Sequence, residues 1–251
     1  MLLGRSRSNQ ASPTLLEDKE NGFGFFRSNL RPNKPRKDLV ETMGHHADGL
    51  KFAGGSFSLI PARAAREMID IAHENKIYVS TGRFMEHILL HLEVFTMVDR
   101  YLQKCKDLGF DVVELSSSFL SFPPDDWLRL TERVQSYNLK PKPELGIQFG
   151  AGGDTEASAL EASDTSNPGK LINLGQKFID MGVERMMIKS EGITENVKSW
   201  RADVIQDTLK GLPVEKIMFE ADKPRVFSCI PEFDYSDMNL NSKNQVLDDQ
   251  F

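Results

Sequence analysis

The chain has 251 residues, of which 39% are hydrophobic and 27% are charged, so it can bury a sizeable core and is too apolar for wholesale disorder. Its formal net charge of -6 provides no basic surface, which makes nucleic acid a poor candidate partner. No run approaches the ~20 apolar residues of a membrane span, and the first residues lack a signal-peptide core, so a cytoplasmic protein without membrane contact is expected.

Composition divides the chain into three parts. Residues 1–36 are rich in Ser, Asn, Arg and Pro and are expected to be a disordered N-terminal segment. Residues 228–251, with clustered Asp and Asn, are expected to be a disordered tail, which leaves residues 37–227 as the folded domain. The two cysteines, Cys105 and Cys229, have no zinc-binding spacing and are expected to be structural thiols.

Strands and helices alternate through residues 37–227. Apolar runs predict six strands, at residues 48–53, 76–81, 110–115, 143–149, 184–189 and 215–221. Helical spacing predicts helices at residues 37–44, 62–76, 84–109, 123–138, 170–182 and 195–211, and a Gly- and Ser-rich loop is expected at residues 150–167. Pro61 marks the start of one of these helices and Gly109 the end of another. Each helix returns the chain to the same edge of the sheet, so the strands are expected to pair in parallel.

Six parallel strands fit either an open doubly wound sheet or most of a barrel. The first strand is not followed by a G-x-G-x-x-G string, so the nucleotide-binding form of the open sheet has little support. A TIM-type (β/α)₈ barrel is therefore expected. In such a barrel, side chains at the carboxyl ends of the strands converge on one mouth.

Charged residues stand at or just after nearly every strand end. They are Lys51, Arg83, Glu86, Glu114, Glu144, Lys189, Glu191 and Glu220. Buried charges are costly unless they pair with one another or hold a ligand, so each belongs either to a salt bridge or to a site. Carboxylate oxygens suit Mg²⁺, whereas lysine and arginine suit an anionic substrate such as a phosphate ester or an enolate.

Seven separated strings resemble, in the same order, the phosphosulfolactate synthase family over residues 39–227. They are GLKFAGGSFSLIP, YVSTGRFMEHIL, LGFDVVELSSSFLSFP, KPELGIQFGAGGD, ERMMIKSEGI, WRADVI and EKIMFEADKPRVF. The greater similarity is to the plant branch of the family, the heat-stress-associated proteins. Members are TIM barrels, and the archetypal enzyme adds sulfite to phosphoenolpyruvate with Mg²⁺, forming a carbon–sulfur bond. The resemblance implies the same barrel here, incomplete because the first and last strands of the family pattern are missing.

The resemblance and the strand-end positions together give each charged residue an expected role. Expected to be catalytic are Glu114, Glu144 and Lys189. Expected to bind substrate are Lys51, Arg83, Glu86 and Glu191. Expected to hold Mg²⁺ are Glu114, Glu144 and Glu220.

The chain departs from the family pattern at two cations. Ile147 and Gln148 follow Gly146 where the pattern has a lysine, and the string KSEG that begins at Lys189 lacks the arginine of the family. Losing cations weakens both the binding of a phosphate and a sulfite and the stabilisation of their charge.

Two functions are consistent with the sequence. The one that the missing cations favour is a stress-protective, thermotolerance protein with weak or no catalysis, which engages other proteins. The alternative is a Mg²⁺-dependent synthase of the carbon–sulfur lyase class, acting on phosphoenolpyruvate and sulfite.

Overall fold

The strands follow one another around a single curled sheet. A computed structural model of the chain describes residues 14–18, 47–91, 93–116, 120, 123–147, 168–195, 197–221 and 239–242. The sheet pairs its strands in sequence order: β1 (Thr14–Asp18), β2 (Ala47–Phe52), β3 (Tyr78–Ser80), β4 (Val112–Leu115), β5 (Lys140–Leu145), β6 (Met186–Ile188), β7 (Ile217–Ala221) and β8 (Asn239–Ser242). The helices are η2 (Ala53–Leu59), α2 (Ala62–Glu74), α3 (Met85–Leu89), α4 (Val94–Leu108), α5 (Pro124–Ser136), α7 (Gly169–Asp180), α8 (Ala202–Gly211) and η3 (Val214–Lys216).

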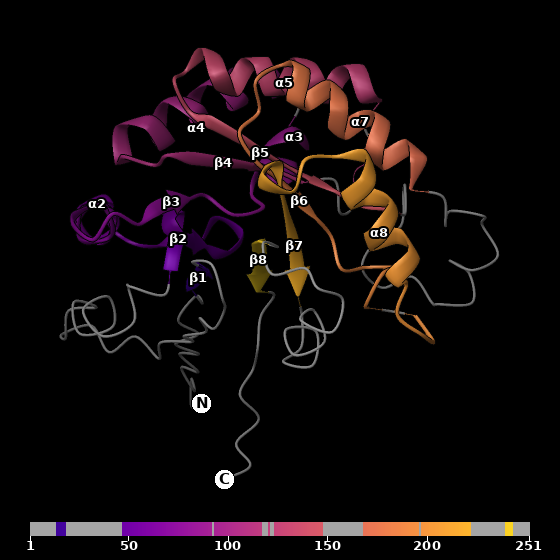
Figure 1. Ribbon diagram of the computed structural model, residues 1–251. Helices are drawn as coiled ribbons and strands as arrows, with labels where there is room; N and C mark the ends of the chain where they lie inside the picture. The colour runs from indigo at the N-terminus through magenta and orange to yellow at the C-terminus, as the bar shows by residue number, and fades with distance from the viewer. Residues whose placement is uncertain are drawn as a thin grey trace, which may run out of the picture.

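Strands β2 to β7 run parallel and form a curled half-barrel, consistent with a TIM-type barrel. Helices α4, α5, α7 and α8 lie in an arc over the outer side of these strands (Figure 1). The α/β fold and the six predicted strands are therefore confirmed. Because the strands point the same way, their carboxyl ends open toward one side, where the mouth was expected.

Two strands that the sequence did not predict flank the half-barrel. Strand β1 pairs with β2 in the antiparallel sense, and β8 pairs with β7 in the parallel sense. The two also contact each other, and Figure 1 shows them on the same side of the molecule. The expected absence of a first and a last strand is thus not confirmed. Both strands are short, and β8 reads NLNS, so neither has the apolar run on which strand prediction depends.

Two helices differ from the prediction. The single helix expected at residues 84–109 is instead two, α3 and α4, separated by a break at which Glu93 takes a non-helical conformation. The helix expected at residues 195–211 begins only at Ala202, after a turn that follows β6. Two helix boundaries are confirmed: α2 begins after Pro61, and α4 ends at Gly109, which is in the left-handed conformation. The helix expected at residues 37–44, the loop expected at 150–167 and Cys229 lie outside the described residues.

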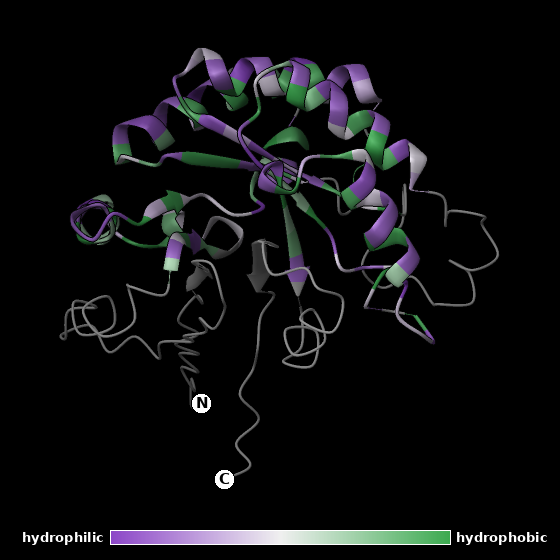
Figure 2. Cartoon of the chain, in the orientation of Figure 1, coloured by the Kyte–Doolittle hydropathy of each residue, from purple (hydrophilic) through white to green (hydrophobic). Residues whose placement is uncertain are grey.

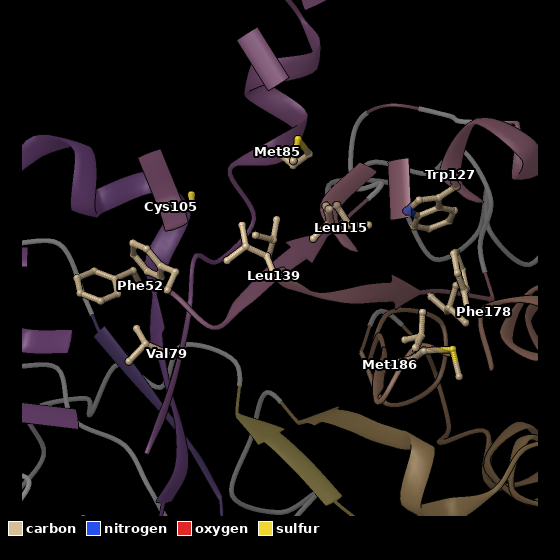
Figure 3. Packing of buried hydrophobic residues seen from close by; sticks show 14 of the residues in the cluster. Phe52, Val79, Met85, Cys105, Leu115, Trp127, Leu139, Phe178 and Met186 are labelled. Atoms are coloured by element: carbon tan, nitrogen blue, oxygen red, sulfur yellow. The ribbon is translucent and has the colours of Figure 1, made fainter. Parts of the chain in front are cut away.

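The core lies between the outer helices and the strands. Coloured by hydropathy, these helices are two-sided, with hydrophobic segments alternating with hydrophilic ones along their length (Figure 2). The labelled side chains of Figure 3, among them Phe52, Cys105 and Phe178, pack in this layer, and Trp127 meets Phe178 edge to face at 5.8 Å. Among the described helices, none combines the length and the apolar character needed to cross a membrane.

Candidate functional site

A chain of charged side chains of alternating sign, all but one of them buried, lies near the carboxyl ends of the parallel strands. We call it the mouth chain, and its members in order of contact are Lys142, Glu114, Lys51, Glu144, Arg83 and Glu220. It unites five of the predicted site residues from β2, β4, β5, β7 and the turn after β3. The sixth member, Lys142, was not predicted.

Glu114 is the most heavily bound member of the mouth chain. Its carboxylate lies 2.7 Å from Nζ of Lys51 and 3.0 Å from Nζ of Lys142. The hydroxyl of Ser80 donates a third contact to it at 2.9 Å. Glu114 is fully buried, so these three donors replace the water that would otherwise solvate its charge.

Glu144 is equally buried but has weaker partners. Its Oε1 lies 3.5 Å from Nζ of Lys51, and its Oε2 lies 3.8 Å from Nε of Arg83. Arg83 also reaches Oε1 of Glu220 at 4.0 Å, which extends the mouth chain to β7. Arg83 is the only part of the mouth chain with a substantially exposed side chain, at 29%. It therefore stands at the rim of the mouth, whereas the other members lie inside.

Strand register explains why these groups meet. Glu114 of β4 and Lys142 of β5 are register partners, as are Lys51 of β2 and Ser80 of β3. Residues two apart on a strand face the same side, so Lys142 and Glu144 point into the barrel together.

The turn after β3 fixes the place of Arg83. Gly82, immediately before it, has φ of +66°, and a Cβ at that position would lie 2.0 Å from the carbonyl oxygen of Phe52. Only glycine fits this close approach of two backbones.

The two central carboxyl groups are held in different states. Burial raises the pKa of Glu114, but the attraction of Lys51 and Lys142 outweighs it and keeps that pKa well below its usual range. Burial raises the pKa of Glu144 above its usual range, and Lys51 and Arg83 only partly offset the effect. Paired carboxyls with pKa values pushed apart can divide the roles of charge carrier and acid between them.

Two cations of the mouth chain, Lys51 and Arg83, stay charged. Burial lowers the pKa of Lys51, but the combined attraction of Glu114 and Glu144 raises it by more, so the net shift of this pKa is upward. Glu144 likewise raises the pKa of Arg83.

The remaining predicted residues lie around this chain. Lys189, at the end of β6, is buried and close enough to lower the pKa of Glu144 electrostatically. Glu86 is buried on α3 and accepts a hydrogen bond from the backbone N–H of Leu120 at 3.3 Å. Glu191 lies in the turn after β6, where it forms a β-bridge with Glu195. Gln148 lies outside the described residues.

Sequence reasoning missed two residues that support the carboxylates. Lys142 went unnoticed because the strand was expected to begin at residue 143, whereas β5 begins at Lys140. The alternation K-x-E from Lys142 to Glu144 was the available signal. Ser190 was also missed: its backbone N–H donates to Glu220 at 3.3 Å, and its hydroxyl lies 2.8 Å from Glu195.

The predicted magnesium ligands do not fit a shared metal ion in this arrangement. Glu114, Glu144 and Glu220 each face a lysine or an arginine of the mouth chain rather than one common point. Within the described part of the chain, no group of three or more His, Cys, Asp or Glu side chains is placed to hold a metal. The requirement for Mg²⁺ stays a prediction.

Comparison with known proteins gives a consistent result. The model of the (2R)-phospho-3-sulfolactate synthase (ComA) family matches residues 16–241. The protein HEAT-STRESS-ASSOCIATED 32 of Arabidopsis thaliana is 32% identical over 232 residues, covering 80% of each chain. The phosphosulfolactate synthase of Methanothermobacter thermautotrophicus is 22% identical over 191 residues, covering 74% of this chain and 69% of that one. The carboxyl transferase domain of Rhizobium etli pyruvate carboxylase is similar in fold, with a TM-score of 0.55 at 9% identity over 82% of this chain and 35% of that one.

Proposed function

Since the chain belongs to the (2R)-phospho-3-sulfolactate synthase family, we propose that it is a stress-protective, thermotolerance protein of the heat-stress-associated branch, with weak or no synthase turnover. Identity supports the branch, because the chain is 32% identical to the heat-stress-associated relative and 22% identical to the archaeal synthase. We propose other proteins as its partners, because protection during heat stress acts on proteins that unfold.

The observation that carries weak turnover is the internal pairing of the mouth chain. Lys51, Arg83 and Lys142 all face carboxylates of the same chain. A synthase must hold a phosphate, a carboxylate and a sulfite at once, so it needs cations that can be given to the substrates. Here every substrate anion has to compete with a glutamate that is already in place.

A heated-client assay tests the protective role. A heat-labile enzyme is warmed with and without the purified chain, and its aggregation is followed by light scattering. We expect a substoichiometric to equimolar amount of the chain to slow the aggregation, whereas serum albumin at equal mass does not. Equal aggregation with the chain and with albumin rules out direct protection of unfolding proteins.

One observation favours synthase activity as the second candidate. Six charged groups meet in a buried mouth, although well-packed apolar side chains of similar volume would stabilise the barrel as well or better. A charged mouth that is not needed for stability points to a ligand. The expected ligand is an anion, and Lys51, Arg83 and Lys189 are the cations that would face it.

For the synthase reaction, each atom has a place. The sulfur of sulfite would bond to the terminal methylene carbon of phosphoenolpyruvate, and the electron pair of the double bond would move to the carbon that carries the phosphate. A proton delivered to that carbon completes the product. Glu144 is the group that suits the delivery of this proton, because burial raises its pKa above the usual range of a carboxyl, while Glu114 stays ionised and orients Lys51.

Two measurements decide between the candidates. Phosphoenolpyruvate is titrated into the protein by calorimetry, and a Kd below about 1 mM supports a working pocket. Formation of phosphosulfolactate from phosphoenolpyruvate and sulfite is then followed by phosphorus NMR. Product that forms with the wild-type chain but not with a Lys51→Met variant establishes the synthase, and binding without product leaves the protective role as the function.

A further inference from the structure

The ammonium at the centre of the mouth chain stands where a metal ion was expected. We propose that Lys51 takes the place of a divalent cation between Glu114 and Glu144, and that the mouth takes up its small anionic ligand without Mg²⁺. The first half of this inference is that Lys51 replaces a metal ion, and it concerns the residues alone. The second half is that the ligand binds without Mg²⁺, and it rests on the proposed anion pocket.

Distances and burial support the first half. Nζ of Lys51 lies 2.7 Å from Oε2 of Glu114 and 3.5 Å from Oε1 of Glu144, so it bridges the two carboxylates. Magnesium bound by protein carboxylates usually keeps several of its waters. Both carboxylates are fully buried and Lys51 is 5% exposed, so this position is shielded from the bulk water that a hydrated Mg²⁺ would bring with it.

The charge balance points the same way. The mouth chain has three cations, Lys51, Arg83 and Lys142, and three carboxylates, Glu114, Glu144 and Glu220. A divalent cation added to it would leave two positive charges without partners in a buried site, which is strongly unfavourable. Around the mouth chain, Lys189 near Glu144 and Glu86 near Arg83 add one charge of each sign and leave this balance unchanged.

Lys51 also offers what a ligand needs from a cation. An ammonium group has three N–H donors. Lys51 donates one to Oε1 of Glu144 at 3.5 Å, and its 2.7 Å contact with Oε2 of Glu114 is a close ion pair rather than an aligned hydrogen bond. Within the part of the chain that the structure describes, no other acceptor faces Lys51, so donors remain for an anionic group of a ligand. Arg83 supplies a second cation at the rim, where its contacts are the longest of the mouth chain.

Titration with Mn²⁺, followed by electron paramagnetic resonance, tests the first half on the full-length protein. The variants are Lys51→Met and, as a matched control, Lys140→Met, which removes an exposed lysine of β5 that pairs with Glu184. We expect no stoichiometric Mn²⁺ binding below about 1 mM for the wild type and the control. We expect Lys51→Met to bind Mn²⁺ at least about tenfold more tightly than the wild type, because it removes the cation that lies between the two carboxylates.

Two results overturn the first half. One is stoichiometric Mn²⁺ binding by the wild type at sub-millimolar concentration that Glu114→Gln abolishes. The other is a folded Lys51→Met protein with no more affinity for Mn²⁺ than the wild type. Should Lys51→Met fail to fold, Lys51→Gln replaces it, and the wild-type titration decides by itself.

Calorimetry with phosphoenolpyruvate tests the second half. We expect the same Kd, within about twofold, in buffer with Mg²⁺ and in buffer with EDTA. Binding that occurs only with Mg²⁺ overturns the inference while supporting the pocket. Silence in both buffers removes the pocket and the second half with it, and the Mn²⁺ titration still decides the first half.

Discussion

Replacing Glu114 by glutamine removes the charge that holds two buried lysines. The substitution keeps the shape of the side chain but leaves Lys142 without its described carboxylate and Lys51 with only the 3.5 Å contact to Glu144. Breaking a buried ion pair from one side costs about 3–5 kcal/mol, because the remaining charge stays buried. At about 2–4 °C per kcal/mol for a chain of this size, we expect Tm to fall by about 6–20 °C.

Thermal and urea unfolding, followed by circular dichroism, measure this loss. Its pH dependence has a definite sign, because the pKa of Glu114 is held below its usual range in the folded state. The stabilisation is complete above the unfolded-state pKa of about 4.3 and disappears as the pH falls through the folded-state pKa. The difference between wild type and Glu114→Gln should therefore be largest at neutral pH and shrink in acid.

A double variant makes the reasoning refutable. Glu114→Gln combined with Lys142→Met removes both partners of one pair and leaves Lys51 balanced by Glu144. We expect the double variant to regain much of the stability lost in the single variant, which is a coupling of well over 1 kcal/mol. A single variant that loses less than about 1 kcal/mol, or a double variant whose loss equals the sum of both singles, contradicts the mouth chain as described.

Three further predictions concern other parts of the molecule. Phe178→Ala should cost about 3–5 kcal/mol in urea unfolding, because the ring is fully buried against Trp127; a loss below about 1 kcal/mol would contradict that packing. Gly82→Ala should cost at least about 1 kcal/mol and weaken anion binding, because the backbone must move away from Phe52 and carry the next residue with it. In a Cys229→Ser background, Cys105 should resist alkylation at pH 8 in the folded protein and react on unfolding, since burial raises its pKa to about 12; rapid labelling without unfolding would refute this.

The half-barrel was predictable because its strands are apolar runs with helices between them. β4 is buried along its whole length and β6 likewise, so their sequences stand out from the polar turns around them. β5 was harder. Its sequence KPKPEL contains two prolines, which usually argue against a strand inside a sheet, and the strand was expected to begin only at residue 143, one residue after Lys142.

Tertiary contacts decided what the sequence could not show. Helical spacing continues across the break between α3 and α4, with no glycine or proline to mark it. The break lets the short α3 bury Glu86, while α4 covers the outside of the sheet. The salt-bridge partners were not predictable either, because strand-end position tells which charges gather but not which of them touch.

Because β1 precedes and β8 follows the other described strands, the seam where they meet can close only after β8 has left the ribosome. Until then, β1 and β7 each present an open edge to the surroundings. During synthesis in a hot cell, a nascent copy would therefore itself need shielding from aggregation, and slower translation of the residues between β7 and β8 would prolong its exposure.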